Sequence, residues 1–282
     1  MTLENARNQP PTSSRTFVTQ NPLEPALGTT RNPAMQEALN TIRRIAATDI
    51  SVLIVGEHGT GKEWAALSIH RLSNRANGSF HTVECSAIPP ENIEKEIFGY
   101  EAINWNGVEI KRGAFEEASG GTLLLDEIEF LPAALQLKIA RILEYQSVRR
   151  ISGGEDLPVN ARLVSTLSQP PDSPFDEDLF RKELFYRASP MIIELPPLRK
   201  RREDIEPLIA NFQKELQQRF GSTARGISAR ALEMCREYEW PGNIRHLRNA
   251  IEYASVMCKG EVIEPGHLPL YLQEKSIPRS EP

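Results

Sequence analysis

Apolar and polar residues alternate along most of the chain in a way that predicts short strands separated by helices. Short runs of β-branched and apolar residues indicate buried strands, and they fall at residues 51–55, 80–84, 122–126, 161–166 and 191–195. Apolar positions at helical spacing indicate helices between them, including one that begins near Asn32-Pro33 and one over residues 133–145. Strands that alternate with helices favour a parallel sheet flanked by helices, so we expect an α/β fold.

The pattern changes beyond residue 199, where we expect a small helical domain. Helical spacing recurs, with no convincing strand pattern, near residues 204–220, 228–238 and 243–258. The stretch "LPPLRKRRED" precedes these helices. We interpret its run Arg199 to Arg202 as a solvated hinge, because two acids follow directly and a nucleic-acid patch would need further basic and aromatic neighbours.

The two ends of the chain are polar and contain prolines, a composition that predicts flexible tails. The chain then divides into a tail at 1–26, an α/β domain at 27–198, a helical domain at 199–272 and a tail at 273–282.

Composition narrows the class of protein. The formal net charge of -5 argues against a dominant basic face, so we expect no direct DNA binding by this chain of 282 residues alone. The three cysteines match no metal-site spacing, which indicates reduced packing residues. No apolar run is long enough to cross a bilayer and the N-terminus lacks an apolar signal core, so we expect a cytoplasmic protein without a membrane segment.

The segment "VLIVGEHGTGKEWAAL" at residues 52–67 has the pattern of a phosphate-binding loop. Its glycines allow the backbone to fold tightly so that N–H groups converge on phosphate oxygens, and Lys62 would reach the terminal phosphates. A glycine-rich turn without a ligand is the alternative, but a strand before the loop and a helix after it favour binding. The candidate binding residues are Gly56, Glu57, His58, Gly59, Thr60, Gly61, Lys62 and Glu63.

A second candidate element is the apolar strand in "GGTLLLDEIEFLP" at residues 120–132, which ends in Asp126 and Glu127. An acid at such a strand end can hold Mg²⁺ through water, and its neighbour can orient or deprotonate an attacking water. Acids that cap a helix start are the alternative. Together with the phosphate loop, this strand predicts a P-loop nucleoside triphosphatase.

With these motifs, the chain resembles a known family, the central AAA+ ATPase domain of the sigma-54-dependent bacterial enhancer-binding proteins. The resemblance extends from about Leu27 to about Leu272, and in this family a Glu at the position of Glu63 is usual. It depends on the collinear motifs "NPAMQEAL", "GEHGTGKE", "SIHRLSNRANGSF", "EIFGYE", "GGTLLLDEI", "FRKELFYR", "LPPLRKRREDI" and "WPGNIRHLRN".

The resemblance implies an AAA+ P-loop fold with a helical lid that uses ATP and Mg²⁺. It implies that Glu127 activates the hydrolytic water, and that Arg181 and Arg187 are arginine fingers that reach the nucleotide of a neighbouring subunit, a role suited to the guanidinium group. Taken alone, such arginines are more often surface or salt-bridge residues. Arg245 matches the sensor arginine of the lid. Fingers that act between subunits imply a ring, usually a hexamer in this family.

Three positions depart from the family pattern. The interval "AINWNGVEIKR" at 102–112 stands where family activators carry the "GAFTGA" loop that contacts sigma-54. Glu84 stands where an Asn holds the catalytic Glu in a switch, and a carboxylate cannot donate to it as an amide does. Ser168 stands at the sensor position that usually carries Asn or His, with Thr166 one place earlier.

Two functions of different kinds follow. The first is a ring-forming ATPase of bacterial transcription regulation, with the sigma-54 contact loop replaced and without a helix-turn-helix domain, so that its contact with sigma-54 RNA polymerase stays open. The second is a degenerate ATP-binding module that joins or inhibits a full-length relative as a hetero-oligomer. A small-molecule P-loop kinase fits poorly, because the lid motifs match the AAA+ pattern.

Overall fold

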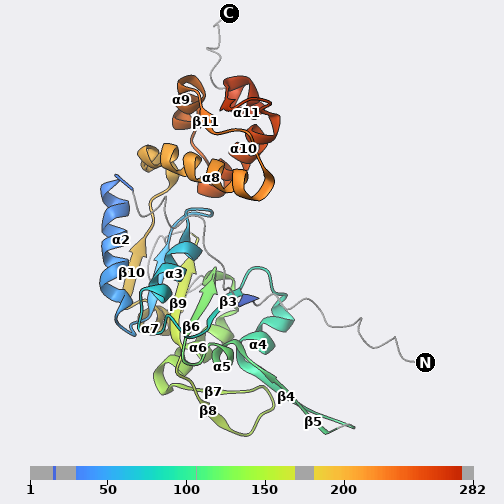
Figure 1. The fold of residues 1–282 in the computed structure, drawn as a ribbon. Helices are drawn as coiled ribbons and strands as arrows, with labels where there is room; N and C mark the ends of the chain where they lie inside the picture. Colours follow the sequence, from blue (N-terminus) through green and yellow to red (C-terminus); the bar gives the residue numbers. More distant parts are fainter. Residues whose placement is uncertain (1–14, 17–29, 106, 169–180, 275–282) are drawn as a thin grey trace, which may run out of the picture. The chain divides into compact units, whose positions relative to one another are not determined.

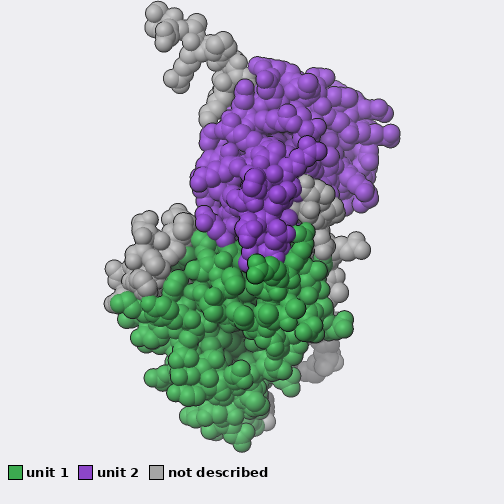
Figure 2. Space-filling model, turned by 90° about the vertical axis from the view of Figure 1, so that its left-hand side faces the viewer, with its two compact units in different colours: residues 1–19, 43–55, 66–193 green, residues 20–42, 56–65, 194–282 purple. Residues whose placement is uncertain are grey.

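The computed structural model describes residues 15–16, 30–105, 107–168 and 181–274. The chain forms two compact units, coloured separately in Figure 2, and each combines separate stretches of the sequence. Unit 1 contains residues 1–19, 43–55 and 66–193, and unit 2 contains residues 20–42, 56–65 and 194–282.

The central element of unit 1 is a six-stranded sheet with the strand order β1-β3-β6-β9-β2-β10 (Figure 1). Its neighbours β3 and β6, β6 and β9, and β9 and β2 are parallel, and β1 is antiparallel to β3. The residues of β6 up to its last are fully covered, as their apolar run predicts. The strands are β1 (Arg15–Thr16), β2 (Val52–Val55), β3 (Phe80–Glu84), β6 (Thr122–Asp126), β9 (Arg162–Leu167) and β10 (Met191–Glu194).

Helices flank this sheet, as expected for an α/β fold. Those wholly within unit 1 are α4 (Pro90–Phe98), α5 (Ala114–Glu117), α6 (Ala133–Tyr145) and α7 (Lys182–Ala188). Two more, α2 (Pro33–Ala46) and α3 (Lys62–Arg71), begin in unit 2 and end in unit 1. The core of unit 1 forms where β3, β6 and β9 meet α4 and α6, around buried side chains such as Phe98, Leu123 and Ile139. The strands expected at 80–84 and 122–126 and the helix expected at 133–145 are confirmed to the residue.

Two hairpins that the apolar pattern did not indicate extend unit 1. One pairs β4 (Gly99–Asn104) with β5 (Gly107–Arg112), and the other pairs β7 (Ser147–Arg149) with β8 (Asp156–Pro158), both antiparallel. The β4 strand of the first hairpin contacts the loop that connects β7 with β8, because Glu101 N donates to Ile151 O at 2.9 Å and Ile151 N donates to Gly99 O at 3.0 Å.

Unit 2 is mainly helical beyond residue 204. Its helices are α8 (Ile205–Phe220), α9 (Ala229–Glu237), α10 (Asn243–Met257) and α11 (Leu270–Glu274). Ser228 caps α9 through its side chain, and Gly221 ends α8 in the left-handed conformation that glycine adopts without a Cβ clash. A short parallel pair, β11 (Gly226–Ile227) with β12 (Val262–Ile263), corrects the expectation that this part contains no strand.

The expected solvated hinge is wrong for Arg201, which has no exposed surface. Its Nη2 donates to Thr60 O at 2.7 Å, and burial lowers its pKa to about 10. Nearby, Thr30 Oγ1 contacts both carboxylate oxygens of Asp204, at 2.7 and 2.8 Å. These contacts join residues 30 and 60 to residues 204 and 201, all within unit 2, although the segments are far apart in sequence. The division expected at 198–199 stays a prediction.

Cys85, Cys235 and Cys258 are free thiols and buried, as expected for packing residues. Of the helices in the described residues, none combines the length and the apolar character needed to span a membrane.

Candidate functional site

The phosphate loop begins directly after β2 and leads into α3. Gly59 and Gly61 have φ values of 77° and 104°, in the left-handed region that favours glycine. Lys62 is buried, and its Nζ lies 2.9 Å from Gly56 O and 3.3 Å from Glu57 O. The Lys62 ammonium therefore donates to carbonyl groups of the loop itself. A phosphate bound in the loop would offer charged oxygen atoms, which are stronger acceptors than these carbonyl groups.

Glu57 fixes the outer side of this loop. Its carboxylate is bound by both terminal nitrogens of Arg199, at 2.5 and 2.8 Å, a two-pronged geometry that is stronger than a single contact. Asn243 Nδ2 also donates to Glu57 Oε2 at 3.2 Å. The hydrogen bonds from Arg199 hold the pKa of the Glu57 carboxyl below its usual value, and the Asn243 amide acts in the same direction.

Arg245 follows on α10 and is exposed. Within the described residues it has no hydrogen bond or ion pair, and its Cβ would lie 3.2 Å from a Cβ built on Gly59. Within unit 2, the backbone of Arg245 thus lies beside Gly59 of the loop, and its role as the lid's sensor stays a prediction. His58 and Glu63 of the predicted binding set are exposed, whereas Thr60 is buried.

The acid pair ends β6 in unit 1. Thr166 Oγ1 donates to Asp126 Oδ1 at 2.5 Å and accepts from the backbone N–H of Glu127 at 2.9 Å. Glu127 has φ 57° and ψ 55°, a left-handed conformation that is uncommon for any residue but glycine and that clusters at functional sites. Thr166 therefore holds both the carboxylate of Asp126 and the backbone of Glu127 at the strand end.

Residues around the pair include those predicted as switch and sensor. Ser168 Oγ donates to Glu127 Oε1 at 3.2 Å, so Ser168 does contact the carboxylate. Glu84 is the register partner of Asp126 on the neighbouring strand β3, but its side chain is exposed. Thr166 and Glu129 were not assigned from the sequence; Glu129 accepts from the backbone N–H of Ser168 at 2.9 Å. The Ser-Thr pair near the end of the apolar segment "RLVSTL" was the sequence signal that could have indicated a role for Thr166.

Magnesium can be tested against the groups present here. Mg²⁺ prefers oxygen ligands and keeps several waters when protein binds it. Asp126, Glu127, Thr166 and Ser168 offer only oxygen atoms. Among the residues with assigned positions, no group of three or more His, Cys, Asp or Glu side chains could cage a metal. The residues fit an ion held by Asp126 through water together with substrate phosphates, and they do not fit one held by protein alone.

The two expected arginine fingers lie at opposite ends of α7, which packs against α6. Arg181 precedes the helix, and its backbone N–H donates to Gln136 Oε1 at 2.8 Å. Arg187 Nη2 lies 2.9 Å from Glu144 Oε2, and both side chains are about two-fifths exposed. An ion pair this exposed contributes only about 0–1 kcal/mol. The Arg187 guanidinium can therefore leave Glu144 for a stronger anion.

The hairpin β4–β5 includes residues 102–112, the interval that stands where family activators carry the contact loop. Directly opposed residues share a face, so Ile103 and Val108 lie together, and Ile110 lies on the same face opposite Glu101. Ile103 is 88% and Trp105 95% exposed. A two-stranded hairpin with an uncovered apolar face is at best marginal in water and suggests a protein contact.

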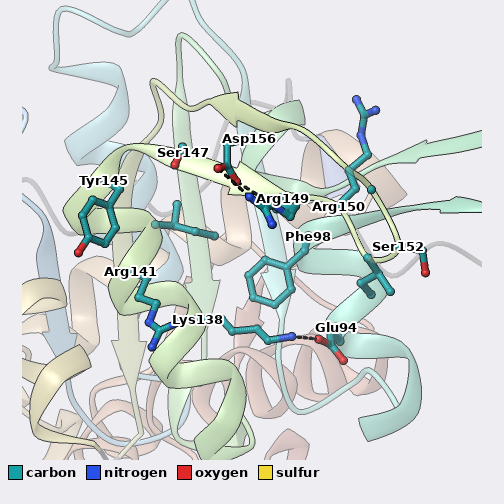
Figure 3. A pocket seen from close by; sticks show the side chains of 13 residues that line it. Glu94, Phe98, Lys138, Arg141, Tyr145, Ser147, Arg149, Arg150, Ser152 and Asp156 are labelled. Carbon is teal, nitrogen blue, oxygen red and sulfur yellow. Dashed lines mark hydrogen bonds and ion pairs between the residues drawn. The ribbon is translucent and has the colours of Figure 1, made fainter.

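Unit 1 also has a hollow of about 690 Å³ between α4, α6 and the β7–β8 hairpin (Figure 3). Its charges largely neutralise one another. Lys138 contacts Glu94, and Arg149 contacts Asp156 through two hydrogen bonds of 2.9 Å. Arg141 and Tyr145 extend from α6 along one side (Figure 3). The hollow brings together neither a nucleophile with a base nor a pair of catalytic acids, and we assign it no chemistry.

Known proteins match both parts of the chain. The family described as Sigma-54 interaction domain matches residues 29–194, and the AAA+ ATPase lid domain matches residues 199–282. The Sigma54-dependent transcriptional regulator SfnR of Pseudomonas fluorescens is 40% identical over 88% of this chain and 70% of its own length. The transcriptional regulatory protein ZraR of Salmonella typhimurium is 38% identical over 87% of this chain and 56% of its own length.

Solved structures of a related regulator also match this chain. NtrX from Brucella abortus in complex with ATP has 36% identity and a TM-score of 0.81, over 89% of this chain and 56% of that chain. The same protein in complex with ADP has a TM-score of 0.77. The chain thus spans little more than half the length of ZraR and NtrX.

Proposed function

Since this chain belongs to the Sigma-54 interaction domain family of AAA+ proteins, we propose that it binds ATP and hydrolyses it to ADP and phosphate. The proposed role of this activity is bacterial transcription regulation. The observation that carries the proposal is the acid pair Asp126–Glu127, oriented by Thr166 and Ser168 at the end of β6. The phosphate loop follows β2 in the chain, and β2 lies two strands from β6 in the sheet of unit 1, parallel to β9, which is itself parallel to β6. Carboxyl ends of parallel strands meet at one sheet edge, where α/β proteins bind their ligands.

The residues take the following roles in this proposal. The glycine loop and Lys62 bind the phosphates, and Arg245 contacts the terminal phosphate from the lid. Asp126 would hold Mg²⁺, whose charge would neutralise the phosphate oxygens when the ion is bound. Glu127 accepts a proton from the attacking water, and Ser168 orients its carboxylate through the 3.2 Å hydrogen bond.

We further propose that the chain works as a ring, a hexamer by analogy with the family, in which Arg181 and Arg187 reach the nucleotide of the next subunit. The buried Nε of Arg181 has no hydrogen-bond partner within the described residues, and the ion pair of Arg187 is exposed and weak. Both guanidinium groups therefore have capacity for an additional anion. Heterologous contacts between identical subunits close into rings when the rotation allows it.

The rate of ATP hydrolysis per subunit is expected to rise with protein concentration, because fingers from a neighbour complete the site only after assembly. Turnover of purified protein, measured across a dilution series with sedimentation in parallel, tests this. A measurable rate that does not depend on concentration or assembly would contradict the neighbour's role. No turnover at any concentration, with ATP still bound, would favour the second candidate below.

The hairpin β4–β5 is the proposed contact with the protein that the ATPase acts on. Trp105→Ser is expected to reduce capture of sigma-54, in the presence of a transition-state analogue, by about tenfold or more, the size of an interface hot spot. ATP hydrolysis should stay within about twofold of wild type, because the hairpin carries none of the site residues. Tyr145→Ser removes another exposed aromatic of unit 1 and is the matched control. Equal capture by both variants would exclude the hairpin.

The second candidate is an ATP-binding module that joins or inhibits a related regulator. Glu84 favours it, because this exposed acid pairs in register with Asp126 where an amide would serve a switch. Wild-type protein that binds ATP, does not hydrolyse it and captures no sigma-54 would support this candidate over the first.

A further inference from the structure

Three consecutive carbonyl groups of the phosphate loop accept hydrogen bonds from donors outside the loop. The pairs are His58 O with Asn243 Nδ2 at 2.9 Å, Gly59 O with Ile244 N at 2.9 Å and Thr60 O with Arg201 Nη2 at 2.7 Å. A trans peptide holds its N–H opposite its C=O, so these bonds turn the N–H groups of Gly59, Thr60 and Gly61 away from the outside donors. Of these, Thr60 N donates to Glu57 O at 3.3 Å, within the loop itself. Convergent N–H groups are what such a loop offers to a phosphate.

Asn243 makes the central contacts of this arrangement. Its side chain has no exposed surface, its Nδ2 also reaches Glu57 Oε2, and its Oδ1 accepts from Leu198 N at 2.8 Å. An amide can donate and accept in this way, whereas a carboxylate cannot donate. Its φ of 50° lies in the left-handed region, which Asn tolerates better than most residues.

The fit between the loop and the start of α10 is close. A Cβ on Gly59 would lie 2.4 Å from Gly242 O, so the backbones touch directly at this point. Arg199 and Asn243 both donate to Glu57 Oε2, at 2.8 and 3.2 Å. All of these residues belong to unit 2. A change in the loop's shape would therefore alter bonds to the helix that carries Arg245, two residues beyond Asn243.

We propose that Asn243 is a positioning residue of the phosphate loop, which holds the loop in its phosphate-binding shape from the side opposite the ligand. The inference rests on the proposed ATP site and adds to it a residue that does not touch the nucleotide. Its loss weakens nucleotide binding, because the free loop then has more conformations to lose when the phosphates bind.

Two variants test the role. Asn243→Gly removes the side chain and keeps the positive φ accessible, and Asn243→Asp keeps the shape but removes the donor. Both are expected to raise the ATP Kd and KM by about tenfold or more, the scale of a lost buried hydrogen bond. The turnover number at saturating ATP should change less than about threefold, since the hydrolytic acids are intact. Amide hydrogen exchange at residues 58–61 without nucleotide should accelerate in both variants.

Controls separate this role from a general effect on folding or charge. Asn249→Asp places the same charge on the exposed face of α10 and is expected to bind ATP like wild type. Adding Glu57→Gln to Asn243→Asp supplies a donor from the loop side and should recover part of the affinity. Unchanged Kd and exchange in both Asn243 variants, with a wild type that binds ATP, would overturn this inference alone. A wild type that binds no nucleotide would overturn both proposals.

Discussion

Glu127→Gln is expected to lower the rate of ATP hydrolysis by about 10²–10⁴-fold, the range for loss of a general base. The amide keeps the size of the carboxylate and can still contact Ser168, but it cannot take a proton from water. ATP binding should persist, because Lys62 and the glycine loop are unchanged. Steady-state phosphate release and fluorescent-nucleotide binding, measured on the same protein, separate the two effects.

The control for this result is Glu117→Gln, an identical change at an exposed position of α5. Its turnover should match that of wild type. If Glu127→Gln hydrolyses ATP at the wild-type rate, another group activates the water, and Glu129, which accepts from Ser168 N, becomes the next candidate.

Arg187→Ala is expected to reduce turnover by about 10³-fold or more, as for other arginine fingers. The ion pair with Glu144 is exposed, so its loss should cost little stability. Arg149→Ala breaks the comparable exposed pair with Asp156 and is the matched control, with turnover expected to stay near wild type.

A mixing experiment then tests whether Arg187 acts between subunits. Glu127→Gln and Arg187→Ala should each be inactive alone, yet their mixture should regain activity, because some interfaces combine an intact Glu127 with an intact Arg187. In a random equal mixture about a quarter of the heterologous interfaces would be intact. A mixture as inactive as its parts, despite assembly confirmed by sedimentation, would place Arg187 outside the neighbour's site.

The sequence predicted best where burial follows a short local pattern. β6 contains "TLLL" before its acids, and α6 repeats apolar residues at helical spacing, so both were identified to the residue. Hairpin β4–β5 has no comparable apolar run, since Ile103, Val108 and Ile110 share one exposed face. The Asn-Gly pair at 106–107 was the turn signal that could have indicated it.

Long-range contacts explain the residues that the sequence could not place. Arg201 lies in a run of basic residues, and such a run is usually solvated; its burial depends on Thr60 and on Met35, 166 residues away. Asn243 precedes the predicted sensor Arg245, but nothing local indicates that its amide reaches the phosphate loop. Thr166 and Ser168 alternate along a strand end, and only the neighbouring strand decides which of them meets which acid.

The left-handed backbone of Glu127 limits how this position can evolve. Glycine, asparagine and aspartate are the residues that such a φ accepts most readily, and β-branched residues are the least suited. Of these, only aspartate keeps a carboxylate, and its side chain is one methylene shorter. A lineage that drifts to glycine or asparagine relieves the backbone and loses the base in the same step. Return to glutamate then has to proceed against the conformational preference of the site.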